Sequence, residues 1–349
     1  MLKAGVIGGS GYTGGELIRI LLFHPEVELT YITSRQNAGK PISFIHPHLR
    51  EITKLKFEDY NASRARDCDV IFLCVPHKAS MDKVPELLSS GLKVIDLSAD
   101  FRLRRKELYE QYYCPHTAPE YLEKAVYGLP ELHREEIKKA DLIACPGCLS
   151  SSIILGLAPF IKSGIIDTEH IIADSKIGSD AAGASFNFMT HHPERANVVR
   201  PYQVTGHRHL AEIEQELGLL AGKEVKVGFT PHAVDMVRGI LSTMHTFLTR
   251  EVTELEVRNI IREFYKDEPF IRILKMSKGY YQLPNPKYVI GSNYCDIGFE
   301  IDTHVNRLLV FSAIDNLIKG SAGPAVQNLN IRYGFKETTG LEFPGLFPA

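Results

Sequence analysis

The sequence has no long apolar run, no large excess of one charge and no signal peptide. Its longest apolar stretch, IILGLAPFIKSGII, is interrupted by Pro159 and Lys162 and is too short to cross a bilayer. Lysine and arginine number 40 against 42 acidic residues, and a net charge of -2 gives no bulk attraction to nucleic acid. The N-terminus, MLKAGVIGGSGYTGG, has neither the apolar core nor the small-residue cleavage site of a signal peptide. We therefore expect a cytoplasmic protein that binds neither nucleic acid nor membranes.

Cysteine is also scarce, with six residues spread over a chain of 349. A disulfide scaffold is far denser in cysteine, so we expect reduced thiols. Cys145 and Cys148 form a CxxC, but no second CxxC or CxxH follows that would complete a four-ligand zinc site. A thioredoxin-like pair usually follows an early strand of a compact single domain. Zinc and redox sites are therefore the weaker interpretations, and we predict no metal.

The pattern of apolar residues changes along the chain. In the first part, short runs such as KAGVIG, DVIFLCVP and KVIDLSA alternate with amphipathic stretches, which predicts a Rossmann-type, doubly wound parallel α/β sheet. Later segments such as HIIADSKI, GILSTMHTFL and FIRILKM predict an α+β domain with a largely antiparallel sheet. The tail from Asn316 is expected to return to the first domain. The predicted domains are residues 1–147 with 316–349, and residues 148–315.

A glycine-rich turn separates the first apolar run from the first amphipathic stretch. Three glycines form G-x-x-G-x-x-G, and a strand, a turn and a helix in this order direct backbone amides and the helix dipole at a pyrophosphate. A merely tight turn is the alternative, although it needs fewer glycines. The predicted cofactor contacts in the turn are Gly8, Ser10, Gly11, Tyr12, Thr13 and Gly14.

The end of the second predicted strand, VELTYITS, indicates which nucleotide binds. About 20 residues past such a turn, an NAD enzyme offers Asp or Glu to the ribose 2′-hydroxyl. This chain has Ser34, Arg35 and Gln36 at that place. A hydroxyl and a guanidinium suit a 2′-phosphate, so we predict NADP(H) with Arg35 as the main contact. An exposed arginine without a ligand is the alternative.

The two cysteines of the CxxC differ in local structure. Cys145 ends the predicted strand ADLIAC, whereas Cys148 follows a Pro-Gly turn and starts a helix, where the dipole and amides favour a thiolate. Cys148 is therefore the predicted nucleophile, and a small buried residue is the alternative. In TGHRHLAEIEQEL, Glu212 follows His209 by three residues and can orient its imidazole on a helix. Either His207 or His209 would serve as the base of a thiolate–imidazole pair.

Seven ordered segments resemble the N-acetyl-γ-glutamyl-phosphate reductases, which are relatives of aspartate-semialdehyde dehydrogenase. They cover nearly the whole chain: GGSGYTGGEL, DLSADFRL, YGLPEL, PGC, GHRHLAEIEQ, TPHAVDMVRGI and DNLIKGSAGPAVQN. The resemblance implies NADPH-dependent reduction of an acyl phosphate to a semialdehyde, through a thioester on Cys148 with histidine as acid and base. It also implies that Asn316 contacts the nicotinamide. Arg102 and Arg238, inside two of the segments, are the predicted phosphate-binding residues.

Two segments depart from the arginine-pathway pattern. PGC is followed by Leu149, Ser150 and Ser151 where those enzymes have Tyr or Phe and then Pro-Thr, and SKIGSDAAGAS stands in place of SGVSGAG. Both departures resemble the lysine-pathway branch, whose acyl phosphate is attached to a small acidic amino-group carrier protein of the LysW type. The implied substrates are carrier-linked aminoadipate 6-phosphate and carrier-linked glutamate 5-phosphate. The alternatives are the free N-acetylated substrate, a non-enzymatic NADP sensor and a zinc protein.

The segment THHPERANVVRPY is the predicted contact for such a carrier. It contains His191, His192, Arg195 and Arg200, and these charges would steer an acidic partner in a salt-dependent way. A solvated loop or a contact between subunits is the alternative. We also expect a homodimer or a homotetramer.

Overall fold

The computed structural model describes residues 1–274 and 282–348, and its contacts divide the chain into two units. The first unit contains residues 1–146 and 321–342, and the second contains residues 147–320 and the end of the chain from Phe343. These bounds differ from the predicted ones at three places, the first of which is Gly147, which lies in the second unit. Residues 316–320 lie in the second unit, where the Gly239 N–H donates to the Asn316 side chain. The chain end joins the same unit because the Leu346 N–H donates to the Ile290 carbonyl.

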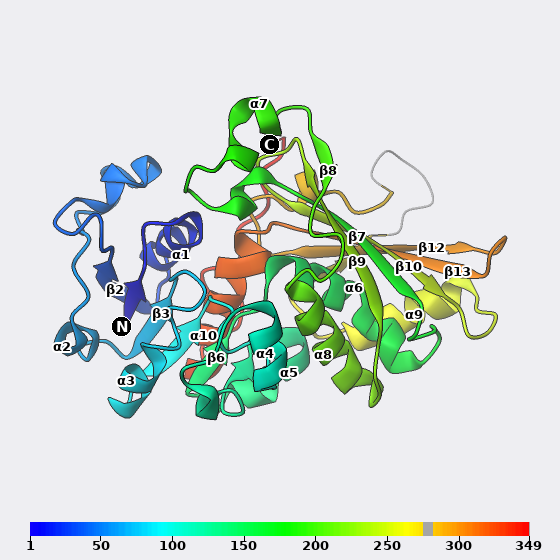
Figure 1. The fold of residues 1–349 in the computed structure, drawn as a ribbon, viewed down its shortest axis with the longest axis horizontal. Coiled ribbons are helices and arrows are strands. Elements are labelled where there is room, and N and C mark those ends of the chain that lie inside the picture. Colours follow the sequence, from blue (N-terminus) through cyan, green and yellow to red (C-terminus); the bar gives the residue numbers. More distant parts are fainter. Residues whose placement is uncertain (275–281, 349) are drawn as a thin grey trace. The chain divides into compact units, whose positions relative to one another are not determined.

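The first unit is built on a parallel sheet of six strands in the order β2-β1-β3-β4-β6-β5 (Figure 1). Its inner strands are buried along nearly their whole length, which is typical of a parallel sheet with both faces covered. The predicted Rossmann-type sheet is confirmed. The strands are β1 (Leu2–Ile7), β2 (Val27–Thr33), β3 (Val70–Leu73), β4 (Lys93–Asp96), β5 (Val126–Tyr127) and β6 (Leu142–Ala144).

β1 pairs with β2 on one side and with β3 on the other, so the strand order reverses at β1. In doubly wound sheets the ligand crevice lies outside the carboxyl ends of the strands at this reversal. The turn after β1 therefore lies where a nucleotide is expected. The helices of this unit are α1 (Tyr12–Leu22), α2 (Ala62–Ala65), α3 (Val84–Ser89), α4 (Lys106–Tyr112), α5 (Pro130–Ile137) and α10 (Gly323–Tyr333).

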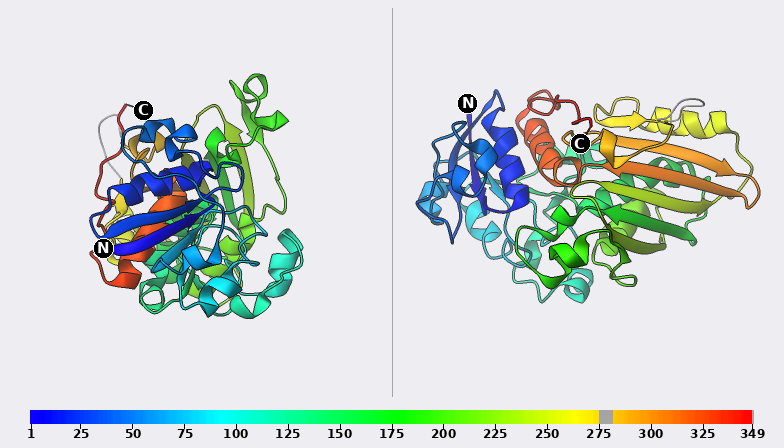
Figure 2. Two further views of the ribbon diagram at one scale, coloured as in Figure 1. Left: turned by 90° about the vertical axis from the view of Figure 1, so that its left-hand side faces the viewer. Right: turned by 90° about the horizontal axis from the view of Figure 1, so that it is seen from above.

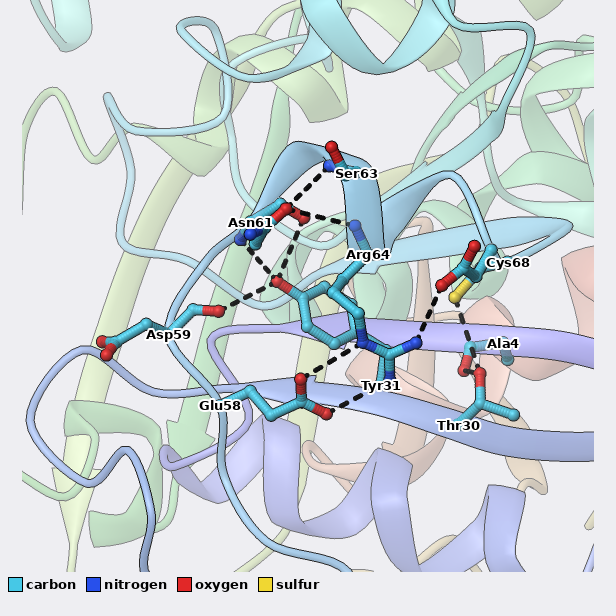
Figure 3. A network of polar contacts seen from close by, with 10 residues as sticks. Ala4, Thr30, Tyr31, Glu58, Asp59, Asn61, Ser63, Arg64 and Cys68 are labelled. Carbon is cyan, nitrogen blue, oxygen red and sulfur yellow. Dashed lines mark hydrogen bonds and ion pairs between the residues drawn. The ribbon is translucent and has the colours of Figure 1, made fainter.

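A polar network ties the segment after β2 to the sheet (Figure 3). The Tyr31 hydroxyl donates to the Asp59 carbonyl at 3.1 Å and accepts from the Asn61 N–H at 2.7 Å. Arg64 in α2 forms an ion pair with Glu58 at 3.4 Å. Burial raises the pKa of Tyr31, so its hydroxyl stays protonated. The network secures the chain next to the end of β2, where the residues predicted to select the cofactor lie.

Helix α10 packs in the first unit although it comes near the end of the chain. The Asn328 amide donates to the Gly128 carbonyl at 3.0 Å, and the Asn330 carbonyl oxygen lies 2.9 Å from Nε2 of His24. Buried amide side chains need such partners. The chain therefore returns to the first unit after passing through the second.

The second unit contains a seven-stranded sheet in the order β11-β12-β13-β10-β7-β9-β8 (Figure 2). The pairs β11–β12 and β7–β9 are parallel and the other pairs are antiparallel, so the prediction of a largely antiparallel sheet is confirmed. Residues 275 and 276 of the predicted strand FIRILKM lie outside the described residues. The strands are β7 (Ile171–Ile177), β8 (Val199–Pro201), β9 (Val227–Val234), β10 (Ile240–Phe247), β11 (Ile271–Ile273), β12 (Cys295–Asp302) and β13 (Arg307–Ile314).

Helices α6 (Cys148–Ser163) and α8 (His209–Ala221) pack against this sheet, α6 on β10, β12 and β13 and α8 on β9. The other helices of the unit are α7 (His192–Arg195) and α9 (Glu254–Phe264). Burial alternates along β7, β9 and β10, as expected when helices cover one face. The other face includes partly exposed apolar side chains such as Ile172 and Phe247. Within the described part of the chain, no helix is long and apolar enough to cross a membrane.

Candidate active site

The glycine turn after β1 is tight at its base and open at its tip. Gly8 has a φ of 88°, and a Cβ there would lie 2.6 Å from the Cys74 carbonyl oxygen at the end of β3. A Cβ on Gly14 would lie 2.8 Å from the Cα of Gly9. Gly11, the N-cap of α1, accommodates a Cβ without any neighbour within 4 Å. The first N–H groups of α1, which lack partners inside the helix, can therefore bind a phosphate in front of it.

The residues that follow β2 differ in exposure. Ser34 is only 4% exposed, and its hydroxyl donates to Ser10 Oγ at 3.0 Å and accepts from the Asn37 amide at 3.2 Å. Ser34 thus links β2 to the glycine turn, and its predicted contact with a 2′-phosphate stays a prediction. Arg35 and Gln36 are exposed, and no residue within 1–274 or 282–348 forms a hydrogen bond or an ion pair with Arg35. The Arg35 guanidinium is thus available to a 2′-phosphate.

The thiol of Cys148 is half-buried at the first position of α6, in the second unit. Gly147 is the N-cap, its N–H donates to Glu212 Oε2 at 2.9 Å, and a Cβ on it would lie 2.6 Å from Nε2 of His209. Gly320 packs against Cys148, the predicted nucleophile, because a Cβ there would lie 2.6 Å from Cβ of Cys148. The start of α8 and the Gly320 turn therefore hold the thiol at the positive end of the α6 dipole. Glu212, predicted to orient His209, accepts this hydrogen bond from the Gly147 N–H, and its action on His209 stays a prediction.

The two histidines before and at the start of α8 have different surroundings. Their ring centroids are 4.8 Å apart, and the His209 N–H donates to Nδ1 of His207 at 3.1 Å. Since Nδ1 accepts, the proton of neutral His207 is on Nε2. Burial, and after it the nearby Arg208, lower the pKa of His207 to about 4. At neutral pH the His207 ring is therefore an uncharged Nε2–H donor, whereas the His209 ring packs against Gly147.

Tyr202 and Arg208 also belong to this neighbourhood, although the sequence reasoning did not select them. The Tyr202 ring lies 5.9 Å from the His207 ring, centroid to centroid. Burial, followed by the proximity of Cys148, raises the pKa of Tyr202 to about 12, while Arg208 and Arg195 act to lower it. Arg208 lies inside the segment GHRH and Tyr202 four residues before it, and this proximity was the available signal.

The two predicted phosphate-binding arginines lie in different units and both have internal partners. Arg102, in the first unit, donates from Nε to the Cys145 carbonyl at 2.7 Å and from Nη2 to the Leu97 carbonyl at 3.1 Å. Arg238, in the second unit, pairs with the fully buried Asp315 at 2.7 Å. Both guanidiniums thus stabilise their own units, and phosphate binding by them stays a prediction.

Asn316, the predicted nicotinamide contact, is nearly buried and has both ends of its amide engaged. Its oxygen accepts from the Gly239 N–H at 2.6 Å, and its nitrogen donates to Asp180 Oδ1 at 2.9 Å. Burial raises the pKa of Asp180 to about 6. The unusual segment SKIGSDAAGAS therefore contributes a carboxyl that orients Asn316. The other departure, at residues 149–151, is fully buried in α6, where the Ser151 hydroxyl donates to the Gly147 carbonyl at 3.1 Å.

Cys145, the other CxxC cysteine, is buried at the end of the first unit's sheet. The Asn328 amide donates to its sulfur at 3.8 Å, and burial raises the pKa of the thiol to about 12. Among residues 1–274 and 282–348, no group of three or more His, Cys, Asp and Glu side chains is placed to hold a metal ion.

Comparison with protein families matches each unit to a domain. Residues 3–140 match the semialdehyde dehydrogenase NAD binding domain, and residues 148–316 match the semialdehyde dehydrogenase dimerisation domain. The LysW-L-2-aminoadipate/LysW-L-glutamate phosphate reductase of Sulfurisphaera tokodaii is 51% identical over 351 residues, covering 100% of both chains. The enzyme of the same name from Sulfolobus acidocaldarius is 51% identical over 352 residues, again covering 100% of both.

Solved structures show the same fold at low identity. Aspartate semialdehyde dehydrogenase II of Vibrio cholerae, complexed with ASA, has a TM-score of 0.71 at 16% identity and covers 96% of this chain and 98% of its own. Aspartate semialdehyde dehydrogenase of Candida albicans with NADP has a TM-score of 0.70 at 17% identity, and the match covers 95% of this chain and 98% of that one.

Proposed function

Because the chain belongs to the semialdehyde dehydrogenase family, we propose that it reduces a carrier-linked acyl phosphate to a semialdehyde in lysine and arginine biosynthesis. The substrates are LysW-linked aminoadipate 6-phosphate and LysW-linked glutamate 5-phosphate, because full-length relatives at 51% identity bear these names. One observation supports this chemistry. Cys148 is the first residue of α6, and His207, which has its proton on Nε2, lies in the same unit. A non-enzymatic NADP sensor would need neither group.

The residues of the first unit suit NADP(H). The glycine turn offers amides at the start of α1, and a Cβ at Gly11 would meet no neighbour within 4 Å. No carboxylate follows β2, where NAD enzymes bind the ribose, and the exposed Arg35 can pair with a 2′-phosphate. Ser34 supports the glycine turn, because its hydroxyl donates to Ser10 Oγ.

Cys148 performs the covalent step. Its thiolate attacks the carbonyl carbon of the acyl phosphate, the bond from carbon to the phosphate oxygen breaks, and phosphate leaves with the electron pair. His207 donates a hydrogen bond from Nε2 to the acyl oxygen, where negative charge develops. Bound NADPH supplies the hydride that reduces the resulting thioester. The C–S bond of the thiohemiacetal then breaks, which releases the semialdehyde and restores the thiolate.

The segment from Gly183 to Gly206 is the proposed contact for the carrier, and we term it the arm. Its exposed side chains include large apolar ones, with Phe186 76% and Phe188 68% exposed, and the polar His191 and His192. Arg195 and Arg200 are half-buried and donate to backbone carbonyls of Ile177, and of Glu194 and Met189. The arm therefore offers an acidic carrier an apolar surface beside partly shielded positive charge, and salt is expected to weaken binding moderately.

A homodimer is the proposed assembly. The second unit matches a domain described as a dimerisation domain. The partly exposed face of its sheet presents Ile172 and Phe247, which a second copy can cover.

One experiment tests the substrate and the cofactor together. Carrier-linked aminoadipate phosphate and free N-acetylglutamyl phosphate are each assayed with NADPH and with NADH, at low and high salt, in wild type and Arg35→Asp. Wild type should prefer the carrier-linked substrate and NADPH. Arg35→Asp should lose roughly tenfold or more of the NADPH preference, because a charge-assisted contact is removed.

Two outcomes contradict these proposals. Efficient, salt-insensitive turnover of the free acetylated compound would return the protein to the ordinary arginine pathway. An unchanged NADPH preference in Arg35→Asp would remove Arg35 from the cofactor site.

A further inference from the structure

A buried histidine lies under the glycine turn, in the first unit. His46 follows the short 3₁₀ turn at Ile42–Phe44, is 6% exposed, and places Nε2 2.8 Å from the carbonyl oxygen of Gly9. A carbonyl oxygen only accepts, so Nε2 carries the proton and donates. Burial lowers the pKa of His46, which keeps the ring neutral at physiological pH.

The surrounding residues keep the imidazole in this place. Its ring lies 6.2 Å from the Phe57 ring, centroid to centroid. On the opposite side is Gly15, where a Cβ would lie 2.5 Å from Cε1 of His46. A glycine inside the first turn of α1 lowers helix stability relative to alanine, and its presence here is explained by the space that the imidazole needs.

The hydrogen bond from His46 determines the direction of the next amide. The Gly9 N–H also donates to the Thr33 carbonyl at 2.9 Å, so the N–H and the carbonyl of Gly9 both have hydrogen-bond partners in this unit. The Gly9–Ser10 peptide is trans, and in a trans peptide the N–H points opposite to the carbonyl. With the Gly9 carbonyl held toward His46, the Ser10 N–H points the other way. No residue in the described ranges accepts a hydrogen bond from it.

We propose that His46 is a positioning residue that aims the Ser10 N–H at the pyrophosphate of the nucleotide. The inference rests on the proposed cofactor and adds a residue 37 positions away from the glycine motif. His46 does not contact the nucleotide itself. It prevents the Gly9–Ser10 peptide from flipping, because a flip would leave the buried imidazole N–H without an acceptor and would direct a carbonyl oxygen at the phosphate.

The test measures nucleotide binding by calorimetry in His46→Phe, His46→Gln and the control His48→Phe. Phenylalanine fills the ring's space without a donor, glutamine restores an N–H donor, and His48 is an exposed histidine two residues away. Each variant is titrated with NADP⁺ and with adenosine 2′-monophosphate, which has no pyrophosphate. Thermal unfolding without ligand shows whether each variant folds.

We expect His46→Phe to bind NADP⁺ roughly tenfold or more weakly, since one well-aimed hydrogen bond to a charged group is lost. Its affinity for adenosine 2′-monophosphate should stay within about twofold. His46→Gln should recover most of the NADP⁺ affinity, and His48→Phe should match wild type.

Equal weakening for both nucleotides would overturn the inference, because it would indicate a general disturbance of the unit. Unchanged NADP⁺ binding in a folded His46→Phe would also overturn it. Failure of the wild-type protein to bind NADP⁺ would instead reject the proposed function, and the role of His46 with it.

Discussion

Each unit carries its proposed chemistry at the start of a helix, and both helices begin after a glycine N-cap without a side-chain cap. The two glycines have similar backbone angles, with φ of -80° at Gly11 and -70° at Gly147. Their surroundings are opposite. A Cβ on Gly11 would meet nothing within 4 Å, whereas a Cβ on Gly147 would lie 2.6 Å from His209.

The difference shows two uses of one local structure. At α1 the glycine leaves open space in front of the helix, so its first backbone amides can bind the phosphate of a ligand. At α6 the glycine makes space for the protein's own histidine, and Glu212 already binds the glycine N–H. The proposed reacting group there is the side chain of Cys148, and a nucleophile needs to be held rigidly.

The largest expected effect is a difference in activity between variants of the two CxxC cysteines, Cys148 and Cys145. Cys148→Ser should lower the rate of acyl-phosphate reduction by roughly a thousandfold or more, because no thioester forms. Cys145→Ser should retain most activity, since that thiol is buried and its pKa is raised to about 12. Steady-state rates of both variants decide the point. Iodoacetamide should label Cys148 and leave Cys145 unlabelled, and equal loss in both variants would instead favour a paired CxxC site.

The next effect concerns the two histidines beside the thiol. His207→Asn should lower kcat by roughly 10²- to 10³-fold with little change in KM, as expected for loss of a positioned hydrogen-bond donor to the developing oxyanion. His209→Asn should reduce kcat less, because the backbone N–H of residue 209 still donates to Nδ1 of His207. With a pKa of about 4, His207 is neutral above pH 5, so its ionisation should not appear in the kcat profile between pH 5 and 8. A greater loss in His209→Asn would exchange the two roles.

The smallest effect tests the two N-cap glycines directly. Gly147→Ala should lower the free energy of unfolding by about 1–3 kcal/mol, because the new methyl group meets the His209 ring. Gly11→Ala should change it by less than about 0.5 kcal/mol, since the site is open and its φ suits alanine. Urea denaturation followed by circular dichroism measures both. A similar loss of unfolding free energy in the two variants would show that the helix start itself requires glycine, independently of the His209 ring.

Short-range patterns were sufficient for the elements of both sites. The glycine spacing after an apolar run predicted the turn between β1 and α1, and the Pro-Gly pair predicted that α6 begins at Cys148. Short apolar runs separated by amphipathic stretches predicted the parallel sheet, and the later β-rich segments predicted the largely antiparallel one. All these signals depend on neighbours within a few residues, where backbone sterics and side-chain periodicity act.

The sequence by itself thus determined the two sheets, the glycine turn and the thiol at a helix start. Only the tertiary structure decided that Ser34 faces inward to Ser10, that Arg102 binds the Cys145 carbonyl, and that Glu212 binds the Gly147 N–H. It also placed His46 under Gly9. The physical reason is that a buried donor or acceptor must find a partner, and which partner it finds depends on segments tens of residues apart that packing brings together.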